Sequence, residues 1–141
     1  MDGISEILAT YNCVSLDEKI QFELDGVVEK EIKQAYCIEN LEFCVSCMDY
    51  TTLKVSDTEE SVKNFTADLL KKLKKFNLRN VAAVCVFSNY AGIVREGLKG
   101  TEIQTAVVAG NFPNSQTFTE IKLAECKMAI GAGAQEVDVV I

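Results

Sequence analysis

The stretch that decides the fold is Val81-Ala82-Ala83-Val84-Cys85-Val86-Phe87. It carries no charged residue, and its side chains do not alternate between apolar and polar as in a strand with one wet face. A run of this length and composition is typical of a strand that is buried on both faces inside a parallel sheet. The stretch therefore predicts a central strand.

Three further apolar runs are predicted strands, and segments with helical periodicity separate the four. The other strands are expected at residues 43–50, 103–109 and 136–141. Helices are expected from a capping start at Asp57 and Glu60 to Phe76, from Tyr90 to Leu98, and from a capping box of Thr117 and Glu120 to Gly131 or Gly133. This alternation predicts an α/β fold, a partial TIM (β/α)₈ barrel with about its first four βα units.

The first 42 residues differ in composition from the rest. They carry ten acidic and three basic residues, a net charge of −7, whereas residues 43–141 carry eleven of each sign. Apolar residues at helical spacing predict a short helix over 4–11 and a longer acidic one over 16–36. Residues 1–42 are therefore expected to be an acidic helical extension, and residues 43–141 the N-terminal half of a barrel.

Composition excludes several classes of function. The net charge of −7 leaves no positive field that would attract nucleic acid or an anionic membrane. The chain has no histidine, which excludes a Ser-His-Asp triad and every metal site built on histidine. No apolar run reaches the roughly 18 residues of a membrane span, and the first residues lack the parts of a signal peptide. We therefore expect no nucleic-acid or membrane partner and a cytoplasmic location.

Six cysteines, at positions 13, 37, 44, 47, 85 and 126, are expected to be reduced thiols in a cytosolic chain. Cys44 and Cys47 have the C-x-x-C spacing, which also occurs in zinc sites and redox pairs. A zinc site would need two more ligands, and the sequence offers neither histidine nor a second C-x-x-C. The sequence favours small buried apolar side chains at both positions, and no metal.

Asp138 is the residue that a buried strand explains least, because apolar residues flank it on both sides. Burying an unpaired carboxylate costs several kcal/mol. The spacing fits equally a structural ion pair and a carboxylate whose shifted pKa serves chemistry. Because alternate residues of a strand share a face, Asp138 is expected opposite Val137 and Val139. The same two alternatives apply less strongly to Asp49, because it lies near the end of a predicted strand, where a side chain can be exposed to solvent.

Four short motifs fall on the predicted strands and on the loop after the third strand. They are Met48-Asp49-Tyr50-Thr51-Thr52-Leu53, Ala83-Val84-Cys85-Val86-Phe87, Asn111-Phe112-Pro113 and Gly133-Ala134-Gln135-Glu136-Val137-Asp138-Val139-Val140-Ile141. In this order and spacing, residues 43–141 resemble the deoxyribose-phosphate aldolase family, up to the fourth barrel strand. The acidic extension resembles that of longer family members.

This resemblance implies a class I aldolase on a TIM barrel, which needs no metal and no cofactor. Such an enzyme cleaves 2-deoxy-D-ribose 5-phosphate reversibly to acetaldehyde and D-glyceraldehyde 3-phosphate through a lysine Schiff base. By the resemblance, Asp138 is the catalytic residue that transfers protons at the Schiff base and carbinolamine. Thr51 lines the substrate pocket with Asp49 as a supporting carboxylate, and Cys85 is the pocket cysteine.

The Schiff-base lysine has no counterpart in this chain. In the family it lies on later strands, whereas all twelve lysines here fall on predicted helices or loops. An exposed helix face does not keep an amine neutral near pH 7. The 141 residues alone are therefore expected to be catalytically incomplete. The alternative is a non-catalytic half-barrel that binds or assembles. Besides the sugar phosphate, the expected partners are a second copy or a separate C-terminal half.

Overall fold

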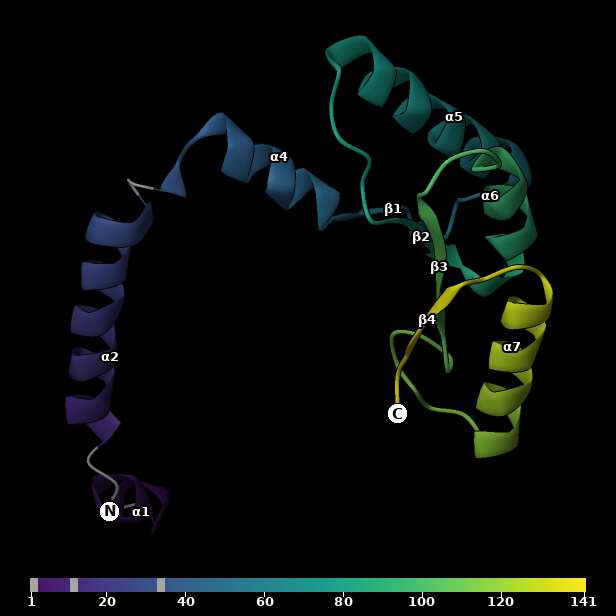
Figure 1. The fold of residues 1–141 in the computed structure, drawn as a ribbon. Helices are drawn as coiled ribbons and strands as arrows, with labels where there is room; N and C mark the ends of the chain where they lie inside the picture. The colour runs from purple at the N-terminus through teal and green to yellow at the C-terminus, as the bar shows by residue number, and fades with distance from the viewer. Residues whose placement is uncertain (1–2, 11–12, 33–34) are drawn as a thin grey trace. The chain divides into compact units, whose positions relative to one another are not determined.

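The computed structural model describes residues 3–10, 13–32 and 35–141, which divide into two compact units, Met1–Leu41 and Glu42–Ile141. In the first unit, α1 spans Gly3–Thr10, α2 spans Cys13–Val27 and the π-helical turn η1 spans Val28–Ile32 (Figure 1). The helices expected over 4–11 and 16–36 thus appear, although Tyr11 and residues 33–34 lie outside the described residues. Within the described ranges, no helix is both long and apolar enough to cross a membrane.

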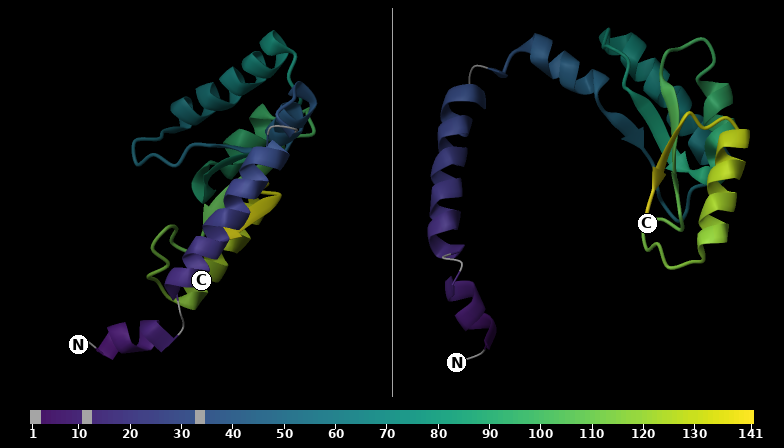
Figure 2. Two further views of the ribbon diagram at one scale, coloured as in Figure 1. Left: turned by 90° about the vertical axis from the view of Figure 1, so that its left-hand side faces the viewer. Right: turned by 60° about the horizontal axis from the view of Figure 1, so that its bottom comes forward.

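In the second unit, four parallel strands form one sheet in the order β1-β2-β3-β4. The strands are β1 (Asp49–Thr51), β2 (Ala83–Phe87), β3 (Gln104–Ala109) and β4 (Glu136–Val139). The connections hold α5 (Glu59–Phe76), the 3₁₀ turn η2 (Ser88–Tyr90) followed by α6 (Ala91–Gly97), and α7 (Thr119–Gly131). These helices line one side of the sheet (Figure 2). The expected α/β fold of successive βα units, a partial barrel, is confirmed.

The two faces of the sheet carry different side chains, because alternate residues of a strand point to opposite sides. On the helix side, Val84, Val86 and Val107 are fully buried in the main core. The helices contribute Val62, Leu69 and Leu73 of α5, Val94 of α6 and Ala129 of α7, and Leu98 just after α6. The opposite side, called the inner face below, holds Ala83, Cys85, Ala106 and Val108. Leu53, Phe87 and Phe112 are partly buried against these inner-face residues.

The prediction of a strand over residues 43–50 is wrong for residues 43–48. Helix α4 spans Ile38–Ser46, and the strand begins only at Asp49. Leu41 and Val45 lie at helical spacing, and Val45 packs against the main core. A short apolar run cannot be assigned to helix or strand from periodicity alone, and the packing of Val45 on the core goes with the helical conformation here.

Both predicted capping motifs are misplaced. The N-cap of α5 is Thr58, whose Oγ accepts from the backbone N–H of Ser61 at 3.2 Å, while the Ser61 hydroxyl accepts from Thr58 N–H at 2.8 Å. Asp57 instead accepts hydrogen bonds from Thr52 Oγ1 and Lys54 N–H, both at 2.9 Å, and so closes the loop after β1. The N-cap of α7 is Phe118, without a side-chain bond, rather than Thr117.

We predict that Thr58→Ala lowers the free energy of unfolding by about 1 kcal/mol, because the backbone N–H of Ser61 loses its acceptor at the N-cap. Glu60→Ala, at the position that the sequence pattern pairs with Asp57, should cost only roughly 0.3 kcal/mol through the helix dipole. Urea unfolding followed by circular dichroism measures both variants. A larger loss for Glu60→Ala than for Thr58→Ala would contradict this cap.

Candidate active site

Asp49, Thr51, Cys85 and Asp138 all lie on the inner face of the sheet. The register pairs Asp49 with Ala83 and Thr51 with Cys85 between β1 and β2, and Val108 with Asp138 between β3 and β4. Because paired residues of neighbouring strands share a face, the inner-face position of Ala83, Cys85 and Val108 carries over to their partners. Val137 packs on the helix side, as the strand parity predicts for the neighbour of Asp138.

The pKa of the Cys85 thiol reflects the burial and the charges on the inner face. Its side chain is buried, and burial is the main cause that raises its pKa to about 11. The negative charges of Asp49 and Asp138 raise the pKa further, while a hydrogen bond with Thr51 acts in the opposite direction. Cys85 is therefore a neutral thiol at pH 7, and carboxylates from β1 and β4 both act on it across the sheet.

Asp138 is exposed, contrary to the expectation of a strand buried on both faces. The register pairs β4 with β3 on one side, and Val139, next to Asp138, keeps 41% of its surface accessible. Among the described residues, no Lys or Arg forms an ion pair with Asp138. Of the two alternatives left open by the sequence, a structural ion pair is thus absent from the described part of the chain.

Sequence reasoning missed Glu125, a residue of α7 whose carboxylate lies at the carboxyl ends of β2 and β3. Glu125 is partly buried and accepts from the Ser88 hydroxyl at 2.8 Å and from the N–H groups of Gly110 and Asn111 at 3.0 and 3.2 Å. A helical signal could have found it, because Glu125 lies one turn before the buried Ala129 and so on the core side of the helix. Burial of an acidic side chain at such a position requires hydrogen-bond donors.

The described lysines lie on helices and loops, and none lies on the four strands. Lys122 of α7 reaches the carboxyl end of the sheet. Its Nζ donates to Ser115 Oγ and, at 3.4 Å, to the carbonyl oxygen of Val140 just after β4. Both contacts connect α7 to the loop before it and to the end of β4.

The thiols of Cys44 and Cys47 are exposed, so the prediction of two buried apolar side chains is wrong. Cys44 lies within α4, directly before the core-packed Val45, and Cys47 lies just beyond the last helical residue. Among the residues that the structure describes, no three acidic or cysteine side chains gather in a way that could hold a metal ion.

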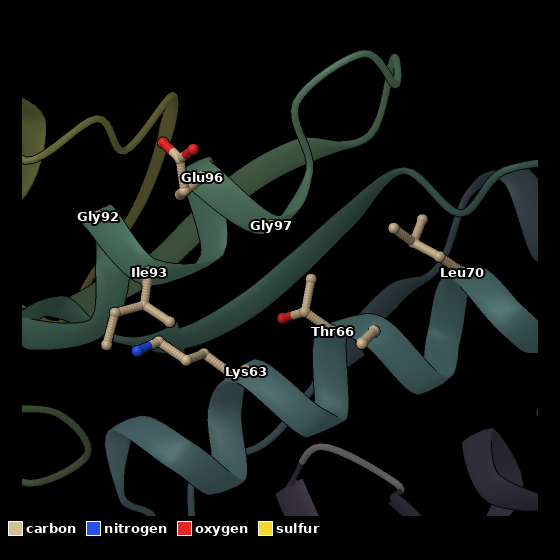
Figure 3. Close-up of a pocket in the computed structure, with 8 residues that line it drawn as sticks. Lys63, Thr66, Leu70, Gly92, Ile93, Glu96 and Gly97 are labelled. Atoms are coloured by element: carbon tan, nitrogen blue, oxygen red, sulfur yellow. The ribbon is translucent and has the colours of Figure 1, made fainter.

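A groove in the helix layer is not part of this site. It has a volume of about 460 Å³ and lies between Thr66 and Leu70 of α5 and Gly92 and Ile93 of α6, with Lys63 at its rim (Figure 3). Its lining is almost entirely apolar. It also lies on the helix side of the sheet, away from the carboxylates of the inner face.

We predict that iodoacetamide alkylates Cys85 about tenfold faster for each pH unit between about pH 7 and 10, because only the thiolate reacts and the pKa is about 11. Peptide mapping by mass spectrometry gives the rate at each cysteine. Exposed Cys44 in the same sample is the control and should react faster throughout. A rate at Cys85 that levels off below about pH 9 would show that the inner face does not raise this pKa.

Curated proteins and solved structures show what the chain is similar to, although no family model matches it. A deoxyribose-phosphate aldolase of Clostridium novyi (strain NT) is 44% identical over 94 residues, which is 67% of this chain and 39% of the relative. One from Bos taurus is 34% identical over 86% of this chain and 40% of the relative. The tetrameric deoxyribose phosphate aldolase of Aeropyrum pernix superposes with a TM-score of 0.55 at 28% identity, over 70% of this chain and 38% of that one.

The chain thus spans about 40% of the length of the curated relatives that it matches. The similarity in sequence and the similarity in structure each cover about two thirds or more of the chain. By sequence and by fold, this protein is a homologue of the deoxyribose-phosphate aldolases.

Proposed function

We propose that the chain supplies part of the active site of a carbon–carbon lyase that cleaves 2-deoxy-D-ribose 5-phosphate reversibly to acetaldehyde and D-glyceraldehyde 3-phosphate. The observation that carries the proposal is the common placement of Asp49, Thr51, Cys85 and Asp138 on the inner face of one parallel sheet. These residues come from the motifs by which the sequence resembles the aldolases. The homology with curated aldolases supports the same assignment.

Asp138 is proposed as the group that moves protons. Formation of an imine from a lysine amine and the substrate carbonyl passes through a carbinolamine, whose hydroxyl must be protonated to leave as water. A carboxyl group within reach of that oxygen donates this proton and takes it back when the imine is hydrolysed. Asp138 is exposed on the inner face and engaged in no ion pair with the described residues, so it is open to such an exchange.

The remaining site residues are proposed to shape the pocket. Thr51 offers a hydroxyl beside the Cys85 thiol. Asp49, two residues before Thr51 on β1, adds a carboxylate on the same face. With a pKa of about 11, Cys85 stays protonated and lines the pocket as a small neutral side chain. The chemistry proposed for these residues uses no metal and no cofactor.

The amine that forms the imine is proposed to come from outside these 141 residues. Such an amine must be desolvated or lie beside another cation to be neutral near pH 7. None of the described lysines lies on a strand, and Lys122 already donates to two oxygens. The chain alone is therefore proposed to be inactive.

The alternative function, a non-catalytic half-barrel that assembles with a second copy or with a separate C-terminal half, is favoured by a different observation. Leu123, Met128 and Ile130 of α7 keep 54%, 76% and 59% of their surface exposed. Surfaces of this kind mark interaction sites. In either case the proposed compartment is the cytosol, with which the free thiols of Cys37, Cys44, Cys47, Cys85 and Cys126 agree.

We predict that the 141-residue chain, incubated with acetaldehyde and borohydride, gains no site-selective adduct, because none of the described lysines lies on a strand of the sheet. Peptide mapping by mass spectrometry detects the reduced imine, and cleavage of 2-deoxyribose 5-phosphate is followed in parallel. The Clostridium novyi relative is the positive control. Selective trapping at Lys122 or Lys54, together with turnover, would refute the proposed incompleteness.

A chimera tests the role of Asp138. Residues 43–141 replace the aligned part of the Clostridium novyi relative, which is 44% identical. The chimera should cleave 2-deoxyribose 5-phosphate, and Asp138→Asn should lower its kcat by about 100-fold or more, because the amide cannot shuttle a proton. Asp68→Asn is the matched control on the exposed face of α5 and should change kcat by less than about twofold. An Asp138→Asn chimera with kcat near the parent would remove Asp138 from the mechanism.

A further inference from the structure

We propose that Glu125 is a positioning residue, which holds the loops after β2 and β3 in the arrangement that the inner-face site needs. The inference rests on the proposed function, and it concerns a residue outside the motifs that carry the family resemblance. Glu125 does not face the inner side of the sheet. It acts through the backbone that it binds.

The carboxylate joins the carboxyl ends of two neighbouring strands. Ser88 is the first residue after β2, and Gly110 is the first residue after β3. The Ser88 hydroxyl donates to Oε1 of Glu125 at 2.8 Å, while the N–H groups of Gly110 and Asn111 donate to Oε2 at 3.0 and 3.2 Å. Both oxygens are used, and α7 is thereby connected to the two central strands at the end where the site lies.

The loop after β3 has a backbone that converges on this carboxylate. Gly110 has φ +82° and Asn111 has φ +61°, so two successive residues are left-handed and direct both N–H groups to one oxygen. Consecutive N–H groups arranged in this way bind an anion. Only glycine suits the first position, because a Cβ there would lie 2.5 Å from the carbonyl oxygen of Val140.

The same loop forms one wall of the site. Phe112, two residues after Gly110, packs on the inner-face cluster that includes Cys85 and Val108. On the other side, Val140 N–H donates to the carbonyl oxygen of Ala109 at 3.2 Å, so the loop also borders the end of the strand that carries Asp138. A shift of residues 110–112 would therefore move a wall of the pocket against both Cys85 and Asp138.

The variants separate the hydrogen bonds of Glu125 from the helix that carries it. Glu125→Ala removes every acceptor. Glu125→Gln keeps one oxygen for the two N–H groups, and its NH₂ can donate to Ser88 Oγ, so it should keep the loop in place. Glu120→Ala is the control, an exposed acid on the same helix. Gly110→Ala leaves the sequence of α7 unchanged and displaces the same loop, because its Cβ would meet the carbonyl oxygen of Val140. It is the second variant if Glu125→Ala fails to fold.

Hydrogen exchange on the complete 141-residue chain tests the contact without any activity. Glu125→Ala should speed exchange at the amides of Gly110 and Asn111 by about tenfold or more, because these donors lose their acceptor, with little change in the core of β3. Glu125→Gln and Glu120→Ala should stay close to the parent. Equal exchange at both amides in Glu125→Ala and in the parent would overturn the proposal.

Kinetics of the chimera test the consequence for the site. Glu125→Ala and Gly110→Ala should each lower kcat by roughly 10- to 100-fold, with a smaller change in KM, as a displaced pocket wall predicts. Glu125→Gln should recover most of kcat. Equal kcat in Glu125→Ala and Glu120→Ala, or a Gln variant as slow as the Ala variant, would refute the positioning role. A parent chimera without turnover would instead refute the proposed function, and the exchange measurement would still decide whether Glu125 holds the loop.

Discussion

Burial of both faces of β2 and β3 is the constraint on which the rest of this structure depends. Val84, Val86 and Val107 are fully buried against the helices, while Cys85 and Ala106 are buried on the inner face. A shift of one residue in either strand would turn the valines to the inner face and bring the smaller side chains under the helices. The register that this burial enforces also sets the face of each residue on β1 and β4, including the two carboxylates of the site.

The inner face combines a neutral thiol with negative charge. Burial is the main cause of the raised pKa of Cys85, and the charges of Asp49, Asp138 and Glu136 raise it further. The same field would favour the charged form of any amine placed near it. An imine-forming lysine that faced these carboxylates would therefore need strong desolvation or a neighbouring cation to keep a free electron pair. Under the proposed function, the acidic character of the inner face constrains the environment that an imine-forming lysine would need.

Several polar side chains near the carboxyl ends of the strands form hydrogen bonds with backbone groups. Asp57 closes the loop after β1, Glu125 joins the ends of β2 and β3, and Lys122 links the loop before α7 to the end of β4. Each of these residues lies outside the strands and reaches back to them. Such contacts let loops, which are free to vary, present a pocket of fixed shape on a rigid sheet.

The sequence by itself determined the parallel sheet, because the uncharged run at 81–87 and the alternation of strand-like and helical segments leave few other folds open. It also determined the face of Asp138, since strand parity is a local property. Only the tertiary structure decided that residues 43–46 are helical, that Thr58 rather than Asp57 caps α5, and that Asp138 is exposed. Each of these depends on contacts distant in sequence: packing of Val45 on the core, the bond between Asp57 and Thr52, and the neighbours of β4. The role of Glu125 belongs with them, because its three donors come from two other loops.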